Sequence, residues 1–231
     1  MSPCKSGGVC IECKTDKEKA MKVLLVNGSP DPKRGTFAAL EEIAKTLNSE
    51  GIETEIFHIG TKPLSGCIDC GNCRKNGKCV FSDSVNEFLE KTADADGFIF
   101  GSPVHYASAG GAMTSFMDRV FFTDMCSGKR SFYLKPAAAV VVARRAGTTA
   151  ALDQLNKYFT ISEMPVISSR YWNMVHSSRS SEDVIKDPEG MQIMRILGKN
   201  MAWFLKCREA GIRAGVPFPE REETVYTNFV R

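Results

Sequence analysis

The amino-acid sequence lacks any long hydrophobic run, although 43% of its 231 residues are apolar. No segment approaches the roughly 20 consecutive apolar residues that a membrane-spanning helix needs. The N-terminus also lacks the hydrophobic stretch of a signal peptide. We therefore expect no membrane association and a cytoplasmic location. The length suits one sizeable domain with a buried core, because two complete domains would be cramped in a chain of this size.

The sequence also has little net charge of either sign. Its 30 Lys and Arg residues are interspersed with 27 Asp and Glu residues, for a formal net charge of +3. No basic stripe is present, so we expect no nucleic-acid partner. Internal repeats and low-complexity tracts are absent as well.

Cysteine, by contrast, is abundant. The chain has nine cysteines, an odd number, and no export signal, which argues against a disulfide framework and favours metal binding or redox chemistry. Four of them, Cys67, Cys70, Cys73 and Cys79, stand close together as C-x2-C-x2-C-x5-C. Four thiolates suit a [4Fe–4S] cluster or a tetrahedral zinc ion. Cysteines that only pack, or that act as redox-active thiols without metal, are the third interpretation, and the residues leave all three open.

The other five cysteines give weaker signals. Cys4, Cys10 and Cys13 form a run with three ligands, which is too few for a closed metal site. They lie in the polar segment 1–20, which we expect to be a disordered extension before the domain. Cys126 and Cys207 fall in segments of expected helix and are interpreted as buried apolar residues.

Short apolar runs alternate with segments of helical spacing along the rest of the chain. We predict strands at residues 22–27, 53–59, 97–101, 137–143 and 165–168, and helices at 36–49, 84–92, 113–123, 148–159 and 190–209. This alternation predicts an α/β fold in which helices cover both faces of one parallel sheet. Five strands with right-handed crossovers favour a doubly wound sheet of the flavodoxin order 2-1-3-4-5. We expect one domain over residues 21–213, followed by a C-terminal arm over 214–231.

The segment from Gly28 to Thr36 is a candidate phosphate loop, because it leaves the first strand and enters the first helix. A helix N-terminus presents free N–H groups to an anion. Ser29 and Thr36 add hydroxyl groups, Arg34 or Lys33 adds charge, and two glycines allow close approach of the backbone. The loop matches neither G-x-G-x-x-G nor a triphosphate loop, so it favours a terminal monophosphate. The alternative interpretation is an ordinary strand–helix turn.

Two further loops leave strands at the same edge of the predicted sheet. Residues 101–108 contain Pro103, His105 and Tyr106, which suit one side of a planar ring, although His105 alone could be a structural loop residue. Residues 143–147 bring Arg144 and Arg145 near the carbonyl end of such a ring. The aromatic segment 171–176 either walls the pocket or makes a subunit contact, and we favour the subunit contact.

These loops together resemble the flavodoxin-like NADPH-dependent FMN reductases. The resemblance rests on Val26-Asn-Gly-Ser-Pro30 with Gly35-Thr36, on Gly101-Ser-Pro-Val-x-Tyr106, and on Arg144-Arg-Ala-Gly-Thr148, and it extends over residues 21–213. It implies bound FMN, reduction by NAD(P)H, and a dimer in which a neighbour helps to cover the flavin. The implied phosphate ligands are Ser29, Arg34, Gly35 and Thr36, and the implied ring contacts are Pro103, Val104, His105, Tyr106, Ser108, Arg144, Arg145 and Gly147. Two departures are Asp31, which stands where the family often has an arginine, and His105, which stands where an aromatic residue is commoner.

The cysteine run resembles the compact motif of the iron–sulfur flavoproteins. These proteins are similar to the reductases but carry a [4Fe–4S] cluster beside FMN, which relays single electrons between the flavin and an external carrier. The resemblance implies Cys67, Cys70, Cys73 and Cys79 as the ligands of the cluster. Related reductases have similar cysteine-rich loops without an established cluster.

Our leading functional prediction is an FMN-dependent NAD(P)H oxidoreductase that reduces a small acceptor, such as a quinone, nitroaromatic or flavin, by ping-pong hydride transfer. Positioning and the flavin itself supply that chemistry, so no catalytic side chain is named. The alternative is an iron–sulfur flavoprotein that exchanges electrons with a ferredoxin-like carrier. A metal-holding binding module that only keeps the fold is a third hypothesis. In either enzyme we expect a homodimer or homotetramer.

Overall fold

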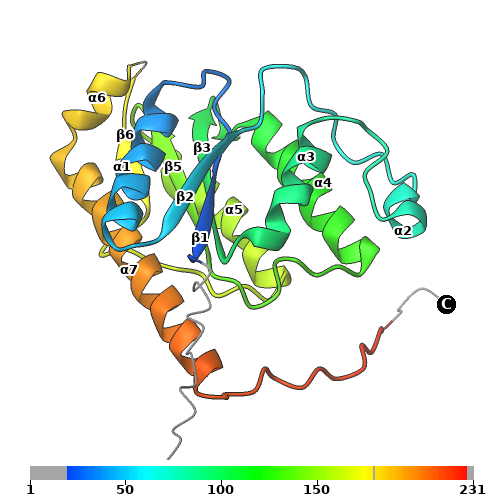
Figure 1. Ribbon diagram of the computed structural model, residues 1–231. Helices are drawn as coiled ribbons and strands as arrows, with labels where there is room; N and C mark the ends of the chain where they lie inside the picture. Colours follow the sequence, from blue (N-terminus) through cyan, green and yellow to red (C-terminus); the bar gives the residue numbers. More distant parts are fainter. Residues whose placement is uncertain (1–19, 179, 228–231) are drawn as a thin grey trace, which may run out of the picture.

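The apolar runs of the chain form a parallel sheet at the centre of the molecule (Figure 1). The computed structural model describes residues 20–178 and 180–227, so Cys4, Cys10 and Cys13 lie outside the described residues. The strands β1 (Lys22–Asn27), β2 (Glu53–His58), β3 (Gly97–His105), β5 (Ala137–Ala143) and β6 (Met174–His176) pair in the order β2-β1-β3-β5-β6, all parallel. The short strand β4 (Ser108–Ala109) folds back antiparallel on the end of β3. The five main strands therefore have the predicted flavodoxin order, which confirms the fold class.

Helices cover both faces of the sheet, so the molecule has three layers (Figure 1). The helices α3 (Ser84–Lys91), α4 (Gly111–Ser127) and α5 (Thr148–Ile161) pack on one face, and α1 (Gly35–Ser49), α6 (Ser181–Ile185) and α7 (Pro188–Arg213) pack on the other. Successive strand residues point to opposite faces. Leu24 and Val26 accordingly join the core under α3, α4 and α5, while Val23 and Leu25 join the core under α1 and α7.

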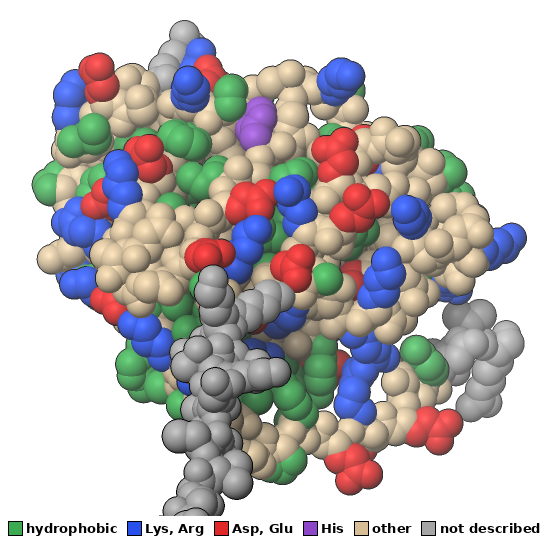
Figure 2. All heavy atoms as spheres, viewed as in Figure 1, with side chains coloured by type: hydrophobic (Ala, Val, Ile, Leu, Met, Phe, Trp, Pro, Cys, Tyr) green, Lys and Arg blue, Asp and Glu red, His purple; other side chains and the backbone are tan. Residues whose placement is uncertain are grey.

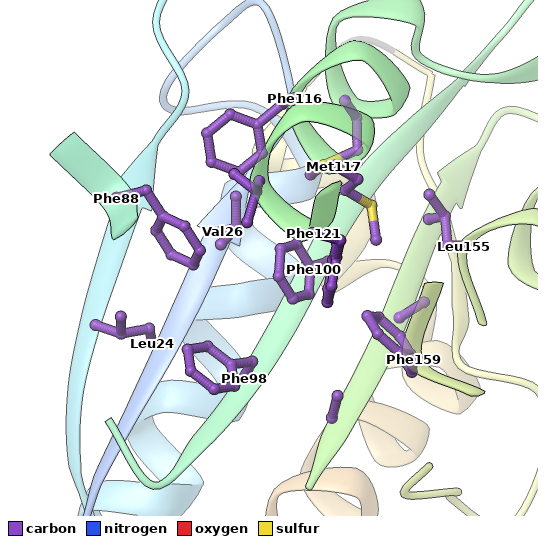
Figure 3. Close-up of a cluster of buried hydrophobic side chains, with 14 of the residues drawn as sticks. Leu24, Val26, Phe88, Phe98, Phe100, Phe116, Met117, Phe121, Leu155 and Phe159 are labelled. Atoms are coloured by element: carbon purple, nitrogen blue, oxygen red, sulfur yellow. The ribbon is translucent and has the colours of Figure 1, made fainter. Parts of the chain in front are cut away.

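Phenylalanine side chains dominate the core on the α3–α4–α5 face (Figure 3). Phe88 of α3 is fully buried and lies 5.3 Å from the ring centroid of Phe57 and 5.4 Å from that of Phe116. Its ring also approaches Phe98 and Phe100 of β3 edge-on. Such aromatic packing contributes to stability beyond the area that it buries. The core thus anchors β3, α3 and α4, from which the site loops emerge.

The fifth strand lies later in the chain than predicted. Residues 165–168 make only one parallel bridge, between Val166 and Ala137, and the strand itself is Met174–His176, which pairs with Val141 to Ala143. The chain advances eight residues from Val166 to Met174 while β5 advances four from Ala137 to Val141, so the intervening residues loop outward. We predicted the strand from the apolar residues at 165–168. The free edge of β5, however, is long enough to contact both this segment and Met174–His176, and only the later segment forms a strand.

Several smaller features also differ from the predictions. β3 continues to His105, so Pro103 and Val104 belong to a strand rather than a loop. A short helix, α2 (Asn72–Asn76), lies inside the cysteine-rich loop, and a 3₁₀ turn (Thr92–Asp94) follows α3. Cys207 is exposed rather than buried, because it lies on the outer side of α7, and Cys126 is partly buried.

The surface and the C-terminal segment complete the description. Basic and acidic side chains are intermixed on the face shown in Figure 2, as the small net charge predicts. None of the helices within residues 20–178 and 180–227 is long and apolar enough to cross a membrane. After α7, residues 214–227 form neither helix nor strand. In this segment Arg221 pairs with Glu163 at 2.7 Å and stacks on Tyr133, so it contacts its own chain.

Candidate functional site

The phosphate loop is held tightly between β1 and α1. The Gly28 N–H donates to the Gly101 carbonyl at 2.9 Å, and the Ser29 N–H donates to Asn27 Oδ1 at 3.1 Å. A Cβ atom at position 28 would lie 2.4 Å from Met113 Cε, so only glycine fits between β3 and α4. The Ser29 hydroxyl accepts the Asp31 N–H at 3.2 Å. These contacts fix the loop beyond the carboxyl end of β1, where doubly wound folds bind their ligands.

The N-terminus of α1 opens toward this loop. The helix begins at Gly35 with no side-chain cap from Arg34, and its first turn has no acidic residue. Its first N–H groups and the positive end of the helix dipole therefore suit an anion. Thr36 is buried in the first turn.

Arg34 and Asp31 form an ion pair at the mouth of the loop. The Nε atom of Arg34 lies 2.7 Å from Asp31 Oδ2, and the Arg34 side chain is exposed. Asp31, the residue that departs from the family pattern, thus partly neutralises the cation nearest the loop. The anion-binding capacity of the loop then depends more on helix α1 than on the charge of Arg34.

A cavity of about 180 Å³ joins the predicted loops with one segment that the sequence analysis missed. Eight of the predicted residues line it, namely Ser29, Arg34, Gly35, Thr36, Pro103, Val104, His105 and Arg144. Ser177 and Ser178, which follow β6, complete the wall. The serine-rich run 177–181 could have indicated these two residues. Because we predicted the fifth strand at 165–168, we did not expect this run to follow a strand at the edge of the sheet where the other loops lie.

Four predicted residues stand outside this cavity. Tyr106 is fully exposed at the tip of the β3–β4 turn, in a left-handed conformation with φ of 54°. The exposed Ser108 donates its hydroxyl to the Ala109 carbonyl. Gly147 caps α5 with φ of 93°, and a Cβ atom there would lie 3.1 Å from Val104, so it borders the cavity wall. The carbonyl of Arg145 lies 3.3 Å from the ring nitrogen Nε2 of His176.

The four clustered cysteines lie in the loop between β2 and α3. Gly71 and Gly77 bracket α2 in left-handed conformations, which let the chain turn sharply around it. Cys67 and Cys70 are exposed, Cys79 is partly buried, and Cys73 is buried. Burial and the neighbouring Cys126 thiol raise the pKa of Cys73. All four cysteines line one small cavity together with Arg119, Phe81 and Phe122.

Comparison with known proteins identifies the family. The family model for NADPH-dependent FMN reductases matches residues 21–178, which is more than half of the chain. The chain belongs to the NADPH-dependent FMN reductase family. It is therefore a flavin-dependent oxidoreductase of that family, and the family implies FMN as its cofactor.

Relatives in this family narrow the comparison. An iron–sulfur flavoprotein of Methanocaldococcus jannaschii is 32% identical over 80% of this chain and 98% of its own length. A second iron–sulfur flavoprotein of that organism is 28% identical over 76% of this chain and 92% of its own length. The crystal structure of RosB with a bound 8-demethyl-8-formylriboflavin-5'-phosphate intermediate superposes with a TM-score of 0.66, at 15% identity, over 92% of this chain and 93% of that chain. That likeness shows the shared fold.

The described residues fit FMN at the phosphate loop. The uncapped start of α1 and the buried Thr36 offer N–H groups and a hydroxyl to a terminal phosphate, whereas the hydroxyls of Ser177 and Ser178 donate to the Ser180 carbonyl and to Asp183. Pro103 and Val104, at the end of β3, line the same cavity with apolar side chains, which suit a planar ring system.

The cysteine loop supplies four sulfur donors, which is the donor set of a cluster or of a zinc ion. Within the described residues, no three Cys, His, Asp or Glu side chains are gathered closely enough to hold one ion. Zinc needs its sulfurs to converge at about 2.3 Å from one centre. A [4Fe–4S] cluster takes each thiolate at a different iron, so its ligands surround a wider core. The four cysteines supply that donor set, but the cavity that they line has a volume of only about 20 Å³, so the loop that carries the exposed Cys67 and Cys70 would have to open around a cluster.

Another cavity, larger than the one beside the phosphate loop, lies away from that loop. It has a volume of about 600 Å³ and is lined by aromatic side chains of α4, α5 and the following loops, among them Phe121, Phe132 and Tyr158. Arg221 and Tyr226 of the C-terminal segment close one side, and Cys67 borders another. None of its described lining residues belongs to the three loops that are predicted to hold FMN.

Proposed function

We propose that this protein is an iron–sulfur flavoprotein that passes electrons between FMN, a [4Fe–4S] cluster and a ferredoxin-like carrier. The observation that carries the proposal is that all four motif cysteines line one small cavity in a chain of the FMN reductase family. The names of the relatives support it further, and they favour this function over direct reduction of a small acceptor by NAD(P)H.

In this proposal the three loops hold the flavin. The α1 N-terminus and its loop bind the phosphate through Ser29, Arg34, Gly35 and Thr36. Pro103, Val104, His105, Tyr106 and Ser108 line one side of the ring, and Arg144, Arg145 and Gly147 lie at its other edge. Donors and positive charge at that edge stabilise electron density on the ring, which is the part of flavin chemistry that a protein supplies.

The cysteine loop provides the second redox site. Cys67, Cys70, Cys73 and Cys79 bind the four irons, with the left-handed glycines allowing the loop to wrap around them. When bound, FMN exchanges one or two electrons and the cluster exchanges one. The loop leaves the carboxyl end of β2 and the phosphate loop leaves that of β1, so both sites emerge from the same edge of the sheet.

The first test is an anaerobic absorption spectrum with iron and acid-labile sulfide assays on the same sample. We expect flavin bands with about four irons and four sulfides per chain. The Cys70→Ser variant should lose iron and keep FMN, whereas the control Cys207→Ser, on the exposed side of α7, should keep both. Wild-type protein with flavin and no iron would refute the cluster, and equal iron in both variants would refute Cys70 as a ligand.

The rival function is an NAD(P)H oxidoreductase with a quinone, nitroaromatic or flavin acceptor, and the family name favours it. Anaerobic stopped-flow mixing separates the two. The proposal predicts fast FMN reduction by reduced ferredoxin and slow reduction by NADH or NADPH. Fast reduction by a nicotinamide, with parallel double-reciprocal plots as the acceptor varies, would establish the ping-pong oxidoreductase instead.

The proposed assembly is a homodimer or homotetramer. Tyr106, Tyr171 and Trp172 are large and exposed, and Tyr106 stands directly after the strand that lines the FMN cavity. A neighbour that packs on these rings would cover the flavin. Light scattering after gel filtration tests the proposal, and a monomer at micromolar concentration would contradict it.

A further inference from the structure

Arg119 of α4 is a buried cation close to the four clustered cysteines. Its side chain is 1% exposed, and burying a charged group is costly unless it is paired and hydrogen-bonded. The residue lies on the helix that starts at the flavin side, where the Gly110 N–H donates to the Ser102 hydroxyl and to the Pro103 carbonyl. Two turns later, α4 brings Arg119 into the wall of the cysteine cavity.

All five N–H donors of the Arg119 guanidinium have partners. Nη1 and Nη2 donate to the two carboxylate oxygens of Asp83 at 2.8 and 2.9 Å, and Nη1 also donates to the Ser65 carbonyl at 3.3 Å. Nε and Nη2 both donate to Cys79 Sγ, at 3.2 and 3.1 Å. A guanidinium has five such donors. Two of them are thus committed to one sulfur.

The choice of a sulfur as double acceptor is informative. A neutral thiol is a weak acceptor, so it is a poor partner for a buried cation. A metal-bound cysteine is a thiolate and carries negative charge. Two N–H groups of a cation match a thiolate ligand well, because charge-assisted hydrogen bonds are about twice as strong as neutral ones.

Cys79 is also fixed through its backbone. The Asn86 side chain of α3 accepts the Cys79 N–H at 3.0 Å and donates to the Cys79 carbonyl at 3.0 Å. Two packed helices therefore hold this one cysteine, at its sulfur and at its peptide groups. Cys67 and Cys70 are exposed by comparison. Cys79 is the preorganised ligand of the set, and residues that orient ligands strongly affect a metal site.

We propose that Arg119 is a positioning residue that holds Cys79 for the cluster and raises the reduction potential of the cluster. Hydrogen bonds to cluster sulfurs and nearby net charge are two of the factors that set this potential. Each electron that enters the cluster increases its negative charge by one, so a buried cation at a ligand sulfur favours the reduced form. The inference rests on the proposed iron–sulfur function.

A variant of Asp83 tests the direction in which the reduction potential of the cluster changes. The Asp83 carboxylate accepts from the Nη1 and Nη2 atoms of Arg119, next to the Nε and Nη2 edge that donates to Cys79. Asp83→Asn keeps an acceptor for the Val85 N–H at the start of α3 but removes the negative charge. The positive charge near the cluster is then less compensated, so the potential should rise. Arg119→Met removes both hydrogen bonds to Cys79 and the cation, so the potential should fall.

The experiment is an anaerobic redox titration of holoprotein with dithionite, followed by the electron paramagnetic resonance signal of the cluster. The FMN potential, read from the same titration by absorbance, serves as internal reference. We expect a higher cluster potential in Asp83→Asn and a lower one in Arg119→Met, with the FMN potential unchanged. Arg119→Lys, which keeps the charge but has fewer donors, should fall between wild type and Arg119→Met. It also replaces Arg119→Met if that variant fails to hold iron.

Lys75→Met is the matched control for charge. Lys75 lies in the same loop but is exposed, so solvent screens its charge and the expected shift is small. If Arg119 is only an ion-pair link between α4 and the loop, the apoproteins of Asp83→Asn and Arg119→Met will both be less stable than wild type in urea unfolding. The cluster potentials of these two variants will then not move in opposite directions. That result would overturn the inference. Absence of iron from the wild-type protein would instead overturn the proposed function.

Discussion

Gly35 is where the phosphate loop meets the segment that the sequence analysis missed. A Cβ atom at this position would lie 2.7 Å from Ser177 Oγ, 2.9 Å from Ser177 Cβ and 3.3 Å from Val142 Cγ1. Ser177 cannot simply rotate away, because its hydroxyl donates to the Ser180 carbonyl at 2.9 Å. Gly35→Ala should therefore force α1 and the β6 end apart.

Two effects of opposite sign determine how much the unfolding free energy of Gly35→Ala changes. Overpacking in a closely packed site costs about 1–3 kcal/mol. Replacing glycine by alanine where the backbone permits it gains about 0.4–1 kcal/mol from the unfolded state. Overpacking wins, so we expect Gly35→Ala to lose about 1–2 kcal/mol of unfolding free energy. Because tenfold in an equilibrium constant is about 1.4 kcal/mol, FMN affinity should fall by roughly 5- to 30-fold if the displacement reaches the phosphate site.

Urea unfolding of the apoprotein measures the stability, and quenching of flavin fluorescence measures the affinity. Gly111→Ala is the control, since Gly111 also begins a helix but has no atom within 4 Å of the added Cβ. It should be neutral or slightly stabilising. In the double variant Gly35→Ala with Ser177→Gly, the two shortest contacts are gone, so the stability losses should be less than additive. Additive losses, or a more stable Gly35→Ala, would refute the packing described for this site.

Two further predictions concern tyrosines. Tyr106→Gly relieves a left-handed backbone conformation but gives the unfolded chain more conformational entropy, and each effect is about 1 kcal/mol. The unfolding free energy should therefore stay near that of wild type, while FMN retention on gel filtration should fall. Unchanged retention would remove Tyr106 from the FMN site. Burial and the hydrogen bond to Asp118 raise the pKa of Tyr158, so the native state holds this proton more tightly than the unfolded chain does. The stabilisation is present at neutral pH and is lost as the pH rises above about 10. The stability advantage of wild type over Tyr158→Phe should shrink from pH 8 to pH 10.5, and a constant difference in urea unfolding would contradict this.

The local sequence carried most of the fold. Buried strands such as Lys22–Asn27 and Ala137–Ala143 contain continuous apolar runs, and helices such as Gly35–Ser49 show apolar spacing on one side. Each signal lies within a few residues of the element that it predicts. The strand order then followed from the handedness of the crossovers. The position of the loop from Gly28 to Thr36 was predictable for the same reason, since strand, loop and helix are consecutive.

Tertiary structure decided the features that depend on residues far apart in the chain. The position of the fifth strand is set by the free edge of β5. This edge pairs with Met174–His176 over three residues and makes a single bridge to Val166. Ser177 and Ser178 join the cavity beside the Gly28–Thr36 loop only because that strand brings them beside α1. Arg119 meets Cys79 across forty residues, and no periodic pattern marks a helical arginine as the partner of a loop cysteine. Such contacts arise from packing between elements, which a local pattern of apolar and polar residues does not encode.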